Sequence, residues 1–203
     1  MPPHFLLYVE GPRDRELLSI FAQRDSRALA KGVKDASVIL GGRQPARAVR
    51  HLEESRLESP EVRGLCVLDR DDPSEVSPAS TPELEFFTWS RRHIESYLLV
   101  PRALRKALAP REDPRRLDRI LRDEVPDGSD EALSQELHAK RLLGAKGPFA
   151  RALGRTPDLG RVARNLRLEE LHPDVVELLG KLRRGLGINH VDVIHRRVAA
   201  DLS

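Results

Sequence analysis

The chain has 203 residues and a mass of 22.9 kDa, enough for one medium domain or a compact domain with a small addition. Hydrophobic residues make up 39% and charged residues 33%, and no apolar run approaches the roughly 18 residues of a membrane span. Cys66 is the only cysteine, which excludes a disulfide framework and a cysteine-based zinc site. The N-terminal residues have neither a basic lead nor a small-residue cleavage site, so we expect a cytoplasmic protein without a signal peptide or a membrane partner.

The first hundred residues alternate between strand and helix patterns. Short apolar runs predict strands over residues 4–9, 36–40, 62–68 and 84–89. Helical spacing predicts helices over about 13–24 and 45–57, and the start of another near 93–99. In the second helix we expect Ala46, Val49, Leu52 and Leu57 to face inward. Strands that alternate with helices predict an α/β fold with a central, mostly parallel sheet.

From residue 101 onward the apolar residues follow helical spacing that prolines and glycines interrupt repeatedly. The only strand pattern there is a weak one at residues 191–194. We therefore expect two parts, an α/β domain over residues 1–100 and a smaller helical region over residues 101–203.

Positive charge is concentrated in the second half of the chain. The first hundred residues carry 14 basic and 16 acidic residues, whereas residues 101–203 carry 21 basic and 16 acidic residues. Residues 140–167 contain eight lysines and arginines against the single acid Asp158. This asymmetry predicts a polyanionic partner such as nucleic acid, with a solvated helix face as the alternative. The candidate contacts are Lys140, Arg141, Arg151, Arg155, Arg161 and Arg164.

Acidic residues follow three of the predicted strands. Glu10 ends the first strand and Asp14 comes one helical turn later, Asp69 and Asp71 follow the third strand, and Glu95 follows the fourth. Parallel strands place their carboxyl ends at one edge of a sheet, so these carboxylates should converge there. Crowded carboxylates repel one another unless a divalent cation lies among them, and oxygen ligands favour Mg²⁺ or Mn²⁺. Removing one carboxylate should therefore relieve repulsion in the metal-free protein. Taken singly, each acid also fits an ordinary turn or helix start.

Three segments carry a family resemblance. Glu10-Gly11-Pro12-Arg13-Asp14 after an apolar strand, followed by Leu68-Asp69-Arg70-Asp71, resembles the TOPRIM domain of primases, topoisomerases and nucleases. The segment from Trp89 to Leu99, which contains IESYLL, resembles OLD-family nucleases and related TOPRIM defence proteins, with Ser96 in place of the usual Asn. The resemblance covers residues 5–100 and thins beyond them, where Leu143-Gly144-Ala145-Lys146-Gly147 is similar to the family's late lysine segment.

This resemblance implies a Rossmann-like TOPRIM domain and a two-metal nuclease. Its metal ligands would be Glu10, Asp14, Asp69, Asp71 and Glu95. The resemblance also implies a catalytic lysine, for which Lys146 is preferred and Lys140 is the rival. The groups that act in catalysis would be Glu10, Asp69, Asp71 and Lys146.

The implied substrate is DNA rather than RNA, and the implied role is defence against phage or mobile elements. The family's nucleases usually carry an ABC-type ATPase domain, and because the sequence has no phosphate-binding P-loop, any ATPase partner would be a separate chain. Homo-oligomerisation stays open. The alternatives are a small TOPRIM ribonuclease and a non-catalytic subunit that binds nucleic acid or acts as a scaffold.

Overall fold

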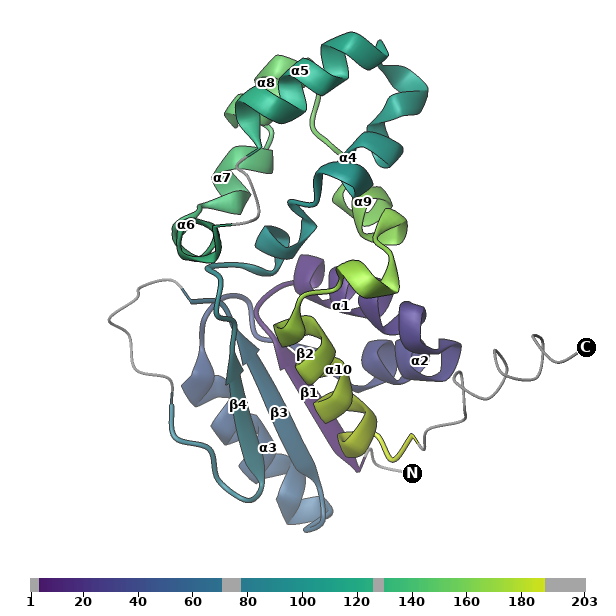
Figure 1. Ribbon diagram of the computed structural model, residues 1–203. Helices are drawn as coiled ribbons and strands as arrows, with labels where there is room; N and C mark the ends of the chain where they lie inside the picture. Colours follow the sequence, from purple (N-terminus) through teal and green to yellow (C-terminus); the bar gives the residue numbers. More distant parts are fainter. Residues whose placement is uncertain (1–3, 71–77, 126–129, 189–203) are drawn as a thin grey trace, which may run out of the picture.

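The computed structural model describes residues 4–70, 78–125 and 130–188. Its centre is a parallel four-stranded sheet with the strand order β2-β1-β3-β4. The strands are β1 (Phe5–Val9), β2 (Ser37–Ile39), β3 (Arg63–Leu68) and β4 (Leu84–Thr88). All four lie where the apolar runs predict them, so the α/β class and the parallel sheet are confirmed (Figure 1).

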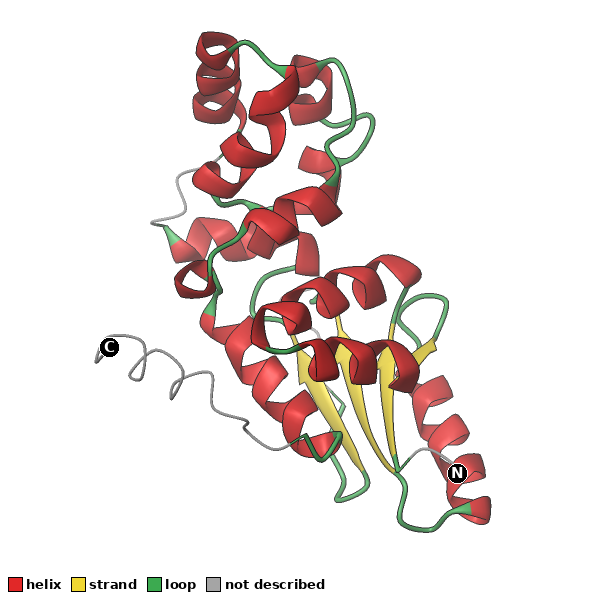
Figure 2. Cartoon of the chain, turned by 90° about the vertical axis from the view of Figure 1, so that its right-hand side faces the viewer, coloured by secondary structure: helices red, strands yellow, loops and turns green. Residues whose placement is uncertain are grey.

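Helices cover both faces of the sheet (Figure 2). Three helices lie on one face, namely α1 (Pro12–Asp25), α2 (Arg27–Ala36) and α10 (Pro173–Gly185). Helix α3 (Pro45–Glu58) lies on the other face. Successive residues of a strand point to opposite faces, so Leu7 and Val9 join the core under α1, whereas Leu6 and Tyr8 pack on α3.

Two details of the helices in the α/β layer differ from the prediction. In α3, Ala48 and Leu52 are buried while Ala46, Val49 and Leu57 are exposed, because α3 contacts the sheet through a narrower stripe than its apolar spacing suggests. Helix α2 was not predicted as a separate element. It begins at an N-cap in which the Ser26 hydroxyl accepts a hydrogen bond from the Leu29 N–H at 3.0 Å.

The segment after β4 forms a 3₁₀-helix, η1 (Ile94–Leu98), in place of the α-helix expected near 93–99. Pro101 begins the next helix, and the residue before a proline is disfavoured in the helical region of backbone space. The turn therefore ends before Val100. Its five residues are buried, which places Glu95 inside the protein rather than on its surface.

The second half of the described chain is helical, as expected, and stands above the carboxyl ends of the strands (Figure 1). Its elements before α10 are α4 (Pro101–Leu108), η2 (Ala109–Arg111), α5 (Pro114–Glu124), α6 (Glu131–Glu136), α7 (Ala139–Leu143), α8 (Pro148–Leu153), α9 (Leu159–Asn165) and η3 (Leu168–Glu170). Prolines in the first turn start several of them, where a missing N–H has no cost. The weak strand pattern at 191–194 lies outside the described residues.

Helix α10 returns from the helical region to the sheet. A Cβ atom at Gly185 would lie 2.2 Å from the Phe5 ring, so only glycine allows the end of α10 to approach β1 this closely. At the other end of α10, Asp174 Oδ2 accepts hydrogen bonds from the Ser90 N–H at 3.0 Å and from the Tyr97 hydroxyl. The α/β layer is therefore completed by a helix that lies far beyond residue 100.

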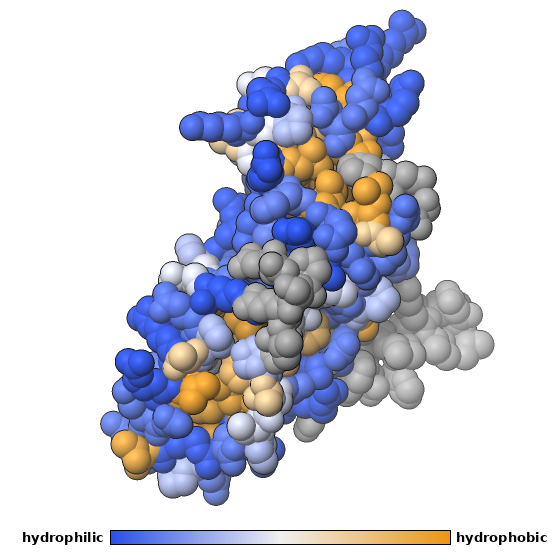
Figure 3. All heavy atoms as spheres, turned by 90° about the vertical axis from the view of Figure 1, so that its left-hand side faces the viewer, coloured by the Kyte–Doolittle hydropathy of each residue, from blue (hydrophilic) through white to orange (hydrophobic). Residues whose placement is uncertain are grey.

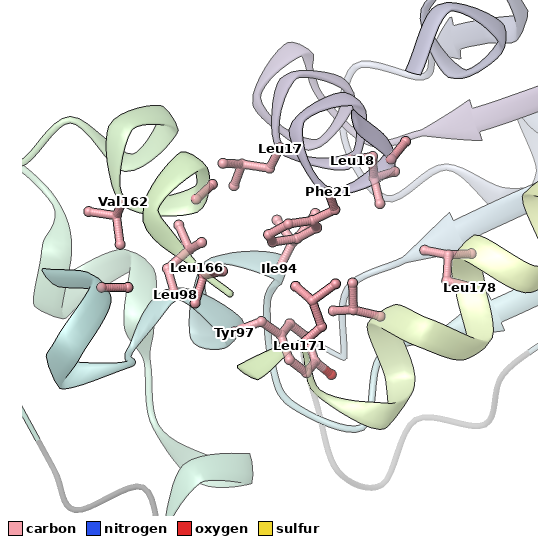
Figure 4. Packing of buried hydrophobic residues seen from close by; sticks show 14 of the residues in the cluster. Leu17, Leu18, Phe21, Ile94, Tyr97, Leu98, Val162, Leu166, Leu171 and Leu178 are labelled. Carbon is pink, nitrogen blue, oxygen red and sulfur yellow. The ribbon is translucent and has the colours of Figure 1, made fainter. Parts of the chain in front are cut away.

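One hydrophobic core runs from the sheet into the helical region (Figure 4). Phe21 of α1 is fully buried and points toward Ile94, with Leu98 of η1 and Leu166 after α9 close by. Because the same cluster contains residues of α1, η1, α9 and α10, the two parts of the chain stabilise one another. Within the described residues, no helix is long and apolar enough to cross a membrane.

Phe21→Ala should lower the free energy of unfolding by about 3–5 kcal/mol, because a large buried ring is lost at the junction. The shared core predicts a single transition, so the fluorescence of the buried Trp89 and the helical circular dichroism should shift together on denaturant titration. Leu57→Ala is the control, since Leu57 is 87% exposed and its loss should cost less than about 0.5 kcal/mol. Two separated transitions would contradict a shared core.

Candidate metal-binding and nucleic-acid site

The structure brings four of the predicted acids to the carboxyl edge of the sheet. Glu10 follows β1, Asp14 lies in the first turn of α1, Asp69 follows β3, and Glu95 lies in η1 after β4. Strands β1 and β3 are neighbours, as are β3 and β4, so their ends meet. We call these four residues the acid cluster. Asp71, the fifth predicted ligand, lies outside the described residues.

Glu10 connects the ends of neighbouring strands through hydrogen bonds. Its Oε1 accepts a hydrogen bond from the Asp69 N–H at 2.8 Å and lies 4.0 Å from the Arg43 guanidinium. Its backbone oxygen accepts from the N–H groups of Gly41 and Gly42 at 3.0 and 2.9 Å, just after β2. Glu10 therefore links β1 to the segments that follow β2 and β3, which fixes the edge on which the other acids lie.

Asp69 is the charged centre of the cluster. Its side chain is only 3% exposed, and Oδ2 accepts a hydrogen bond from the Lys140 ammonium and lies 3.4 Å from His93 Nδ1. Burial by itself would raise the pKa of Asp69, but the contacts with His93 and Lys140 hold it below its ordinary value. Asp69 is therefore ionised despite its burial.

Asp14 and Glu95 behave in the opposite way. Burial raises the pKa of both carboxyls above their ordinary values, and the nearby charge of Asp69 adds to the rise. Lys140 opposes the rise in both cases. The expected repulsion among the acids therefore raises the pKa values of Asp14 and Glu95. It does not raise the pKa of Asp69, because that carboxylate is paired with the Lys140 ammonium.

Glu95 also has an unsatisfied oxygen. The residue is 6% exposed, and its Oε2 is buried without a hydrogen-bond partner among the described residues. Buried carboxylate oxygens nearly always accept a hydrogen bond or contact a cation, so this oxygen marks a place where a cation fits. Glu95 belongs to a buried turn, so its position is fixed by packing.

Of the two candidate lysines, the structure places Lys140 beside the acids. Lys140 lies in α7. Its ammonium contacts Asp69, and its positive charge also interacts electrostatically with Glu95 and Asp14. Burial opposes the charge, but the contact with Asp69 raises the pKa of Lys140 above its ordinary value. Lys146 is exposed in the turn after α7, and its backbone oxygen accepts a hydrogen bond from Arg151 at 3.1 Å. The geometry therefore favours Lys140 for a role at the acid cluster.

Two histidines extend from Asp69, since His93 contacts Asp69 and His138 contacts His93. His93 is 3% exposed, and its Nε2 lies 3.1 Å from His138 Nδ1, with the ring centroids 4.7 Å apart. Burial lowers the pKa of His138, and the neighbouring His93 lowers it further. The pair therefore links Asp69 to the residue that precedes α7, the helix that carries Lys140.

The donor set of the acid cluster fits a hard divalent cation. Carboxylate oxygens are the ligands that Mg²⁺ and Mn²⁺ prefer, and the unsatisfied Glu95 oxygen is a direct sign of a missing partner. As the side chains stand, no three His, Cys, Asp or Glu residues in the described part of the chain come together as a ready ligand group. The Lys140 ammonium neutralises Asp69 in this arrangement.

A cavity of about 260 Å³ opens beside the acid cluster. It has charged and apolar walls, contributed by α1, η1, α7, the turn after α7 and the start of α9. The lining residues are Arg13, Glu95, Lys140, Leu143, Gly144, Ala145, Thr156, Pro157 and Leu159. We call it the side cavity.

The basic residues predicted to contact nucleic acid are not equivalent. Arg155 lies 3.2 Å from Glu112 and joins the helices of its region, and Lys140 faces the acid cluster. Arg164 lies 3.8 Å from Asp158 with both side chains more than half exposed. Arg141 and Arg151 are exposed and Arg161 is half-buried. The stretch 140–167 therefore divides into structural cations and exposed ones.

A further set of arginines lies on α5, which the charge count did not single out. Arg115, Arg119 and Arg122 are exposed on the helix face opposite its buried residues. None of the three makes an ion pair with another described residue. We call them the α5 arginine stripe. Hydrophilic side chains dominate this end of the helical region (Figure 3).

Sequence reasoning also missed His93, His138 and Arg43 as neighbours of the acids. His93 lies two residues before Glu95 and Arg43 directly follows the Gly41-Gly42 turn, so both were near recognised features. His138 had no such signal, because it reaches the site only through the packing of α7. Comparison with known proteins finds no matching family model, curated protein or solved structure.

Lys140→Met should lower the free energy of unfolding at neutral pH by about 1–2 kcal/mol. This is below the roughly 3–5 kcal/mol for breaking a fully buried pair, because the Lys140 side chain is 42% exposed. Lys146→Met is the matched control and should change little, since Lys146 is exposed. Denaturant titration of the metal-free proteins measures both values.

The loss should depend on pH in a defined direction. The lowered pKa of Asp69 contributes stability above the unfolded value of about 3.9, and this is lost as pH falls through the folded value. The raised pKa of Lys140 contributes stability below about 10.4, which is lost as pH rises through the folded value. The difference between wild type and Lys140→Met should therefore be largest between these limits. A difference that does not vary with pH would show that the loss comes from packing alone.

Proposed function

We propose that the protein is a metal-dependent nuclease that hydrolyses phosphodiester bonds in DNA. The observation that carries this proposal is the acid cluster. Glu10 and Asp69 follow adjacent parallel strands and are joined by a 2.8 Å hydrogen bond, and Asp14, Glu95 and Lys140 are coupled to Asp69. Carboxylates at the carboxyl edge of a parallel sheet, with a lysine among them, suit the binding of cations and phosphates.

The residues that would hold Mg²⁺ or Mn²⁺ are Glu10, Asp14, Asp69 and Glu95, and the family resemblance adds Asp71. Bound divalent cations would supply charge stabilisation at the phosphate and a lowered pKa of water. The pKa of Asp69 is lowered, whereas the pKa values of Asp14 and Glu95 are raised, and a bound cation would favour the ionised form of both carboxyls.

Lys140 supplies the charge that the phosphate needs. An ammonium close to the cluster can offset negative charge that develops in the transition state. In the present arrangement it neutralises Asp69, so binding of a cation to Asp69 would release Lys140 toward the substrate. This assigns to Lys140 the role for which the sequence resemblance prefers Lys146.

The proposed substrate follows from charge. The helical region stands above the acid cluster, and its exposed arginines present positive charge to a polyanion. The family resemblance alone supports DNA over RNA as the substrate and endonuclease activity as the reaction. It also supports a role in defence and a separate ABC-type ATPase chain as a partner. A small TOPRIM ribonuclease would use the same residues on RNA.

A non-catalytic nucleic-acid-binding subunit is the second candidate function. It is favoured by the ion pair between Lys140 and Asp69, which balances the buried charge without a cation. The observation against it is the buried Oε2 of Glu95, which has no hydrogen-bond partner among the described residues and so suits a cation ligand. Cleavage assays separate the two candidates directly.

Incubation with plasmid, linear DNA and structured RNA should give cleavage with Mg²⁺ or Mn²⁺ and none with EDTA. Asp69→Asn should slow cleavage by about a hundredfold or more, the scale of losing one preorganised electrostatic group. The matched control is Asp158→Asn, which changes an exposed helix cap that asparagine fills equally well. Gel assays under single-turnover conditions measure the rates.

Absence of cleavage on every substrate, together with measurable cation binding by calorimetry, would favour the non-catalytic subunit. Cleavage of RNA alone would favour the ribonuclease. Equal rates for Asp69→Asn and wild type would contradict the proposed site.

The double variant Arg119→Glu, Arg122→Glu should weaken DNA binding and flatten its salt dependence. Each lost phosphate contact should reduce the slope of log affinity against log salt by roughly one. Arg50→Glu is the control, because Arg50 is exposed on α3, which covers the other face of the sheet. Fluorescence anisotropy in EDTA measures the affinities. An equal loss in the Arg50 control would show that only net charge matters.

A further inference from the structure

The side cavity combines two kinds of wall. Leu143, Pro157 and Leu159 give it an apolar part, while Arg13 and Lys140 bring positive charge. Arg13 makes only a loose pair with Glu16 at 3.6 Å, and half of each side chain is exposed, so its charge is available to a ligand. An apolar surface next to two cations suits a ligand with a flat, weakly polar part and a phosphate.

The size of the cavity limits the ligand. Its volume of about 260 Å³ lies just below the roughly 300–1,000 Å³ of typical small-molecule sites. It therefore has room for one group the size of a nucleotide and not for a base pair. Glu95 both lines the cavity and belongs to the acid cluster, so the cavity adjoins the proposed cation site.

We propose that the side cavity binds one unpaired nucleotide of the substrate next to the acid cluster. The base would lie against Leu143, Pro157 and Leu159, and its phosphate would face Arg13, while Lys140 stays paired with Asp69 until a cation binds there. This rests on the proposed function, because it assumes that the substrate of the acid cluster is a nucleic acid.

A paired strand cannot use this cavity. In a duplex the bases are stacked and hydrogen-bonded, so a base enters a protein pocket only after it is unstacked, at a cost of a few kcal/mol. That cost is least where the strand is already single or locally unpaired. The protein therefore selects single-stranded or locally unpaired DNA over a fully paired duplex.

The cavity does not select one base strongly. The wall against which the base would lie is aliphatic, since it is formed by Leu143, Pro157 and Leu159. Sequence readout in single strands rests on hydrogen bonds to base edges, and these three side chains offer no donor or acceptor for them. The selectivity is for an unpaired nucleotide rather than for a sequence.

The test is a binding experiment in EDTA, which separates recognition from cleavage. Three labelled DNA probes of one sequence are compared by fluorescence anisotropy: a single strand, a full duplex and a duplex with one bulged nucleotide. Wild type should bind the single strand and the bulged duplex at least about tenfold more tightly than the full duplex, a difference of about 1.4 kcal/mol.

Ala145→Trp should fill the cavity and abolish this preference while duplex affinity stays within about twofold. Ala145 is exposed at the turn after α7, so the variant should fold, and thermal unfolding checks this. Thr156→Trp is a second cavity-filling variant. Ala46→Trp, at an exposed position of α3 outside the cavity, is the matched control and should keep the preference.

The outcomes separate the cavity from the nuclease. Equal affinity of wild type for all three probes, or a preference that survives in both cavity variants, overturns the cavity proposal even if the protein cleaves DNA. Loss of the preference in Ala145→Trp and Thr156→Trp but not in Ala46→Trp supports it. That result would stand even if no cleavage is found with any cation.

Discussion

Charge balance around Asp69 is the constraint on which the site depends. A carboxylate that is 3% exposed can stay ionised only beside positive or donating groups, and here these are Lys140 and His93. Lys140 is 71 positions away in the sequence and arrives on α7 of the helical region. A lysine of the helical region therefore balances the buried charge at the carboxyl edge of the sheet.

The hydrophobic core sets the position from which Lys140 reaches Asp69. Phe21 and Leu17 of α1 pack against residues of η1 and α9, so the helical region is held over the carboxyl edge of the sheet (Figure 4). Polar contacts reinforce this arrangement. Arg91 binds Glu131 of α6 through two hydrogen bonds of 3.0 and 2.6 Å, close to the end of β4. Packing thus brings α7 within reach of the acids, and the ion pair follows.

The arginines of this chain serve two purposes that composition cannot separate. Some are structural, such as Arg102, whose guanidinium binds both carboxylate oxygens of Glu170 and the Asn165 backbone oxygen. Others, such as those of the α5 arginine stripe, are exposed and carry charge toward solvent. Only the second group adds to the electrostatic potential that a polyanion meets. A basic stretch of sequence is therefore a poor guide to a binding surface until its ion pairs are known.

The strands and their acids were predictable because their signals are local. A buried parallel strand is visible in the sequence as a short apolar run. Glu10 and Asp69 follow two such runs directly, and Glu95 comes six residues after the run over 84–89. Strand ends at one edge of a parallel sheet then follow from topology alone. Helix α2 and the inward face of α3 were not predictable in the same way, because a serine cap and a narrow contact stripe outweighed the apolar spacing.

The sequence by itself determined the α/β class, the parallel sheet and the convergence of four acids at its carboxyl edge. Only the tertiary structure decided which lysine stands among them, since Lys140 and Lys146 are six residues apart and equal in type. It also decided that α10 returns to the sheet and that a cavity lies beside Glu95. The reason is physical. The strands and the acids that follow them are set by local apolar patterns, whereas the choice between two lysines depends on how distant helices pack on a shared core.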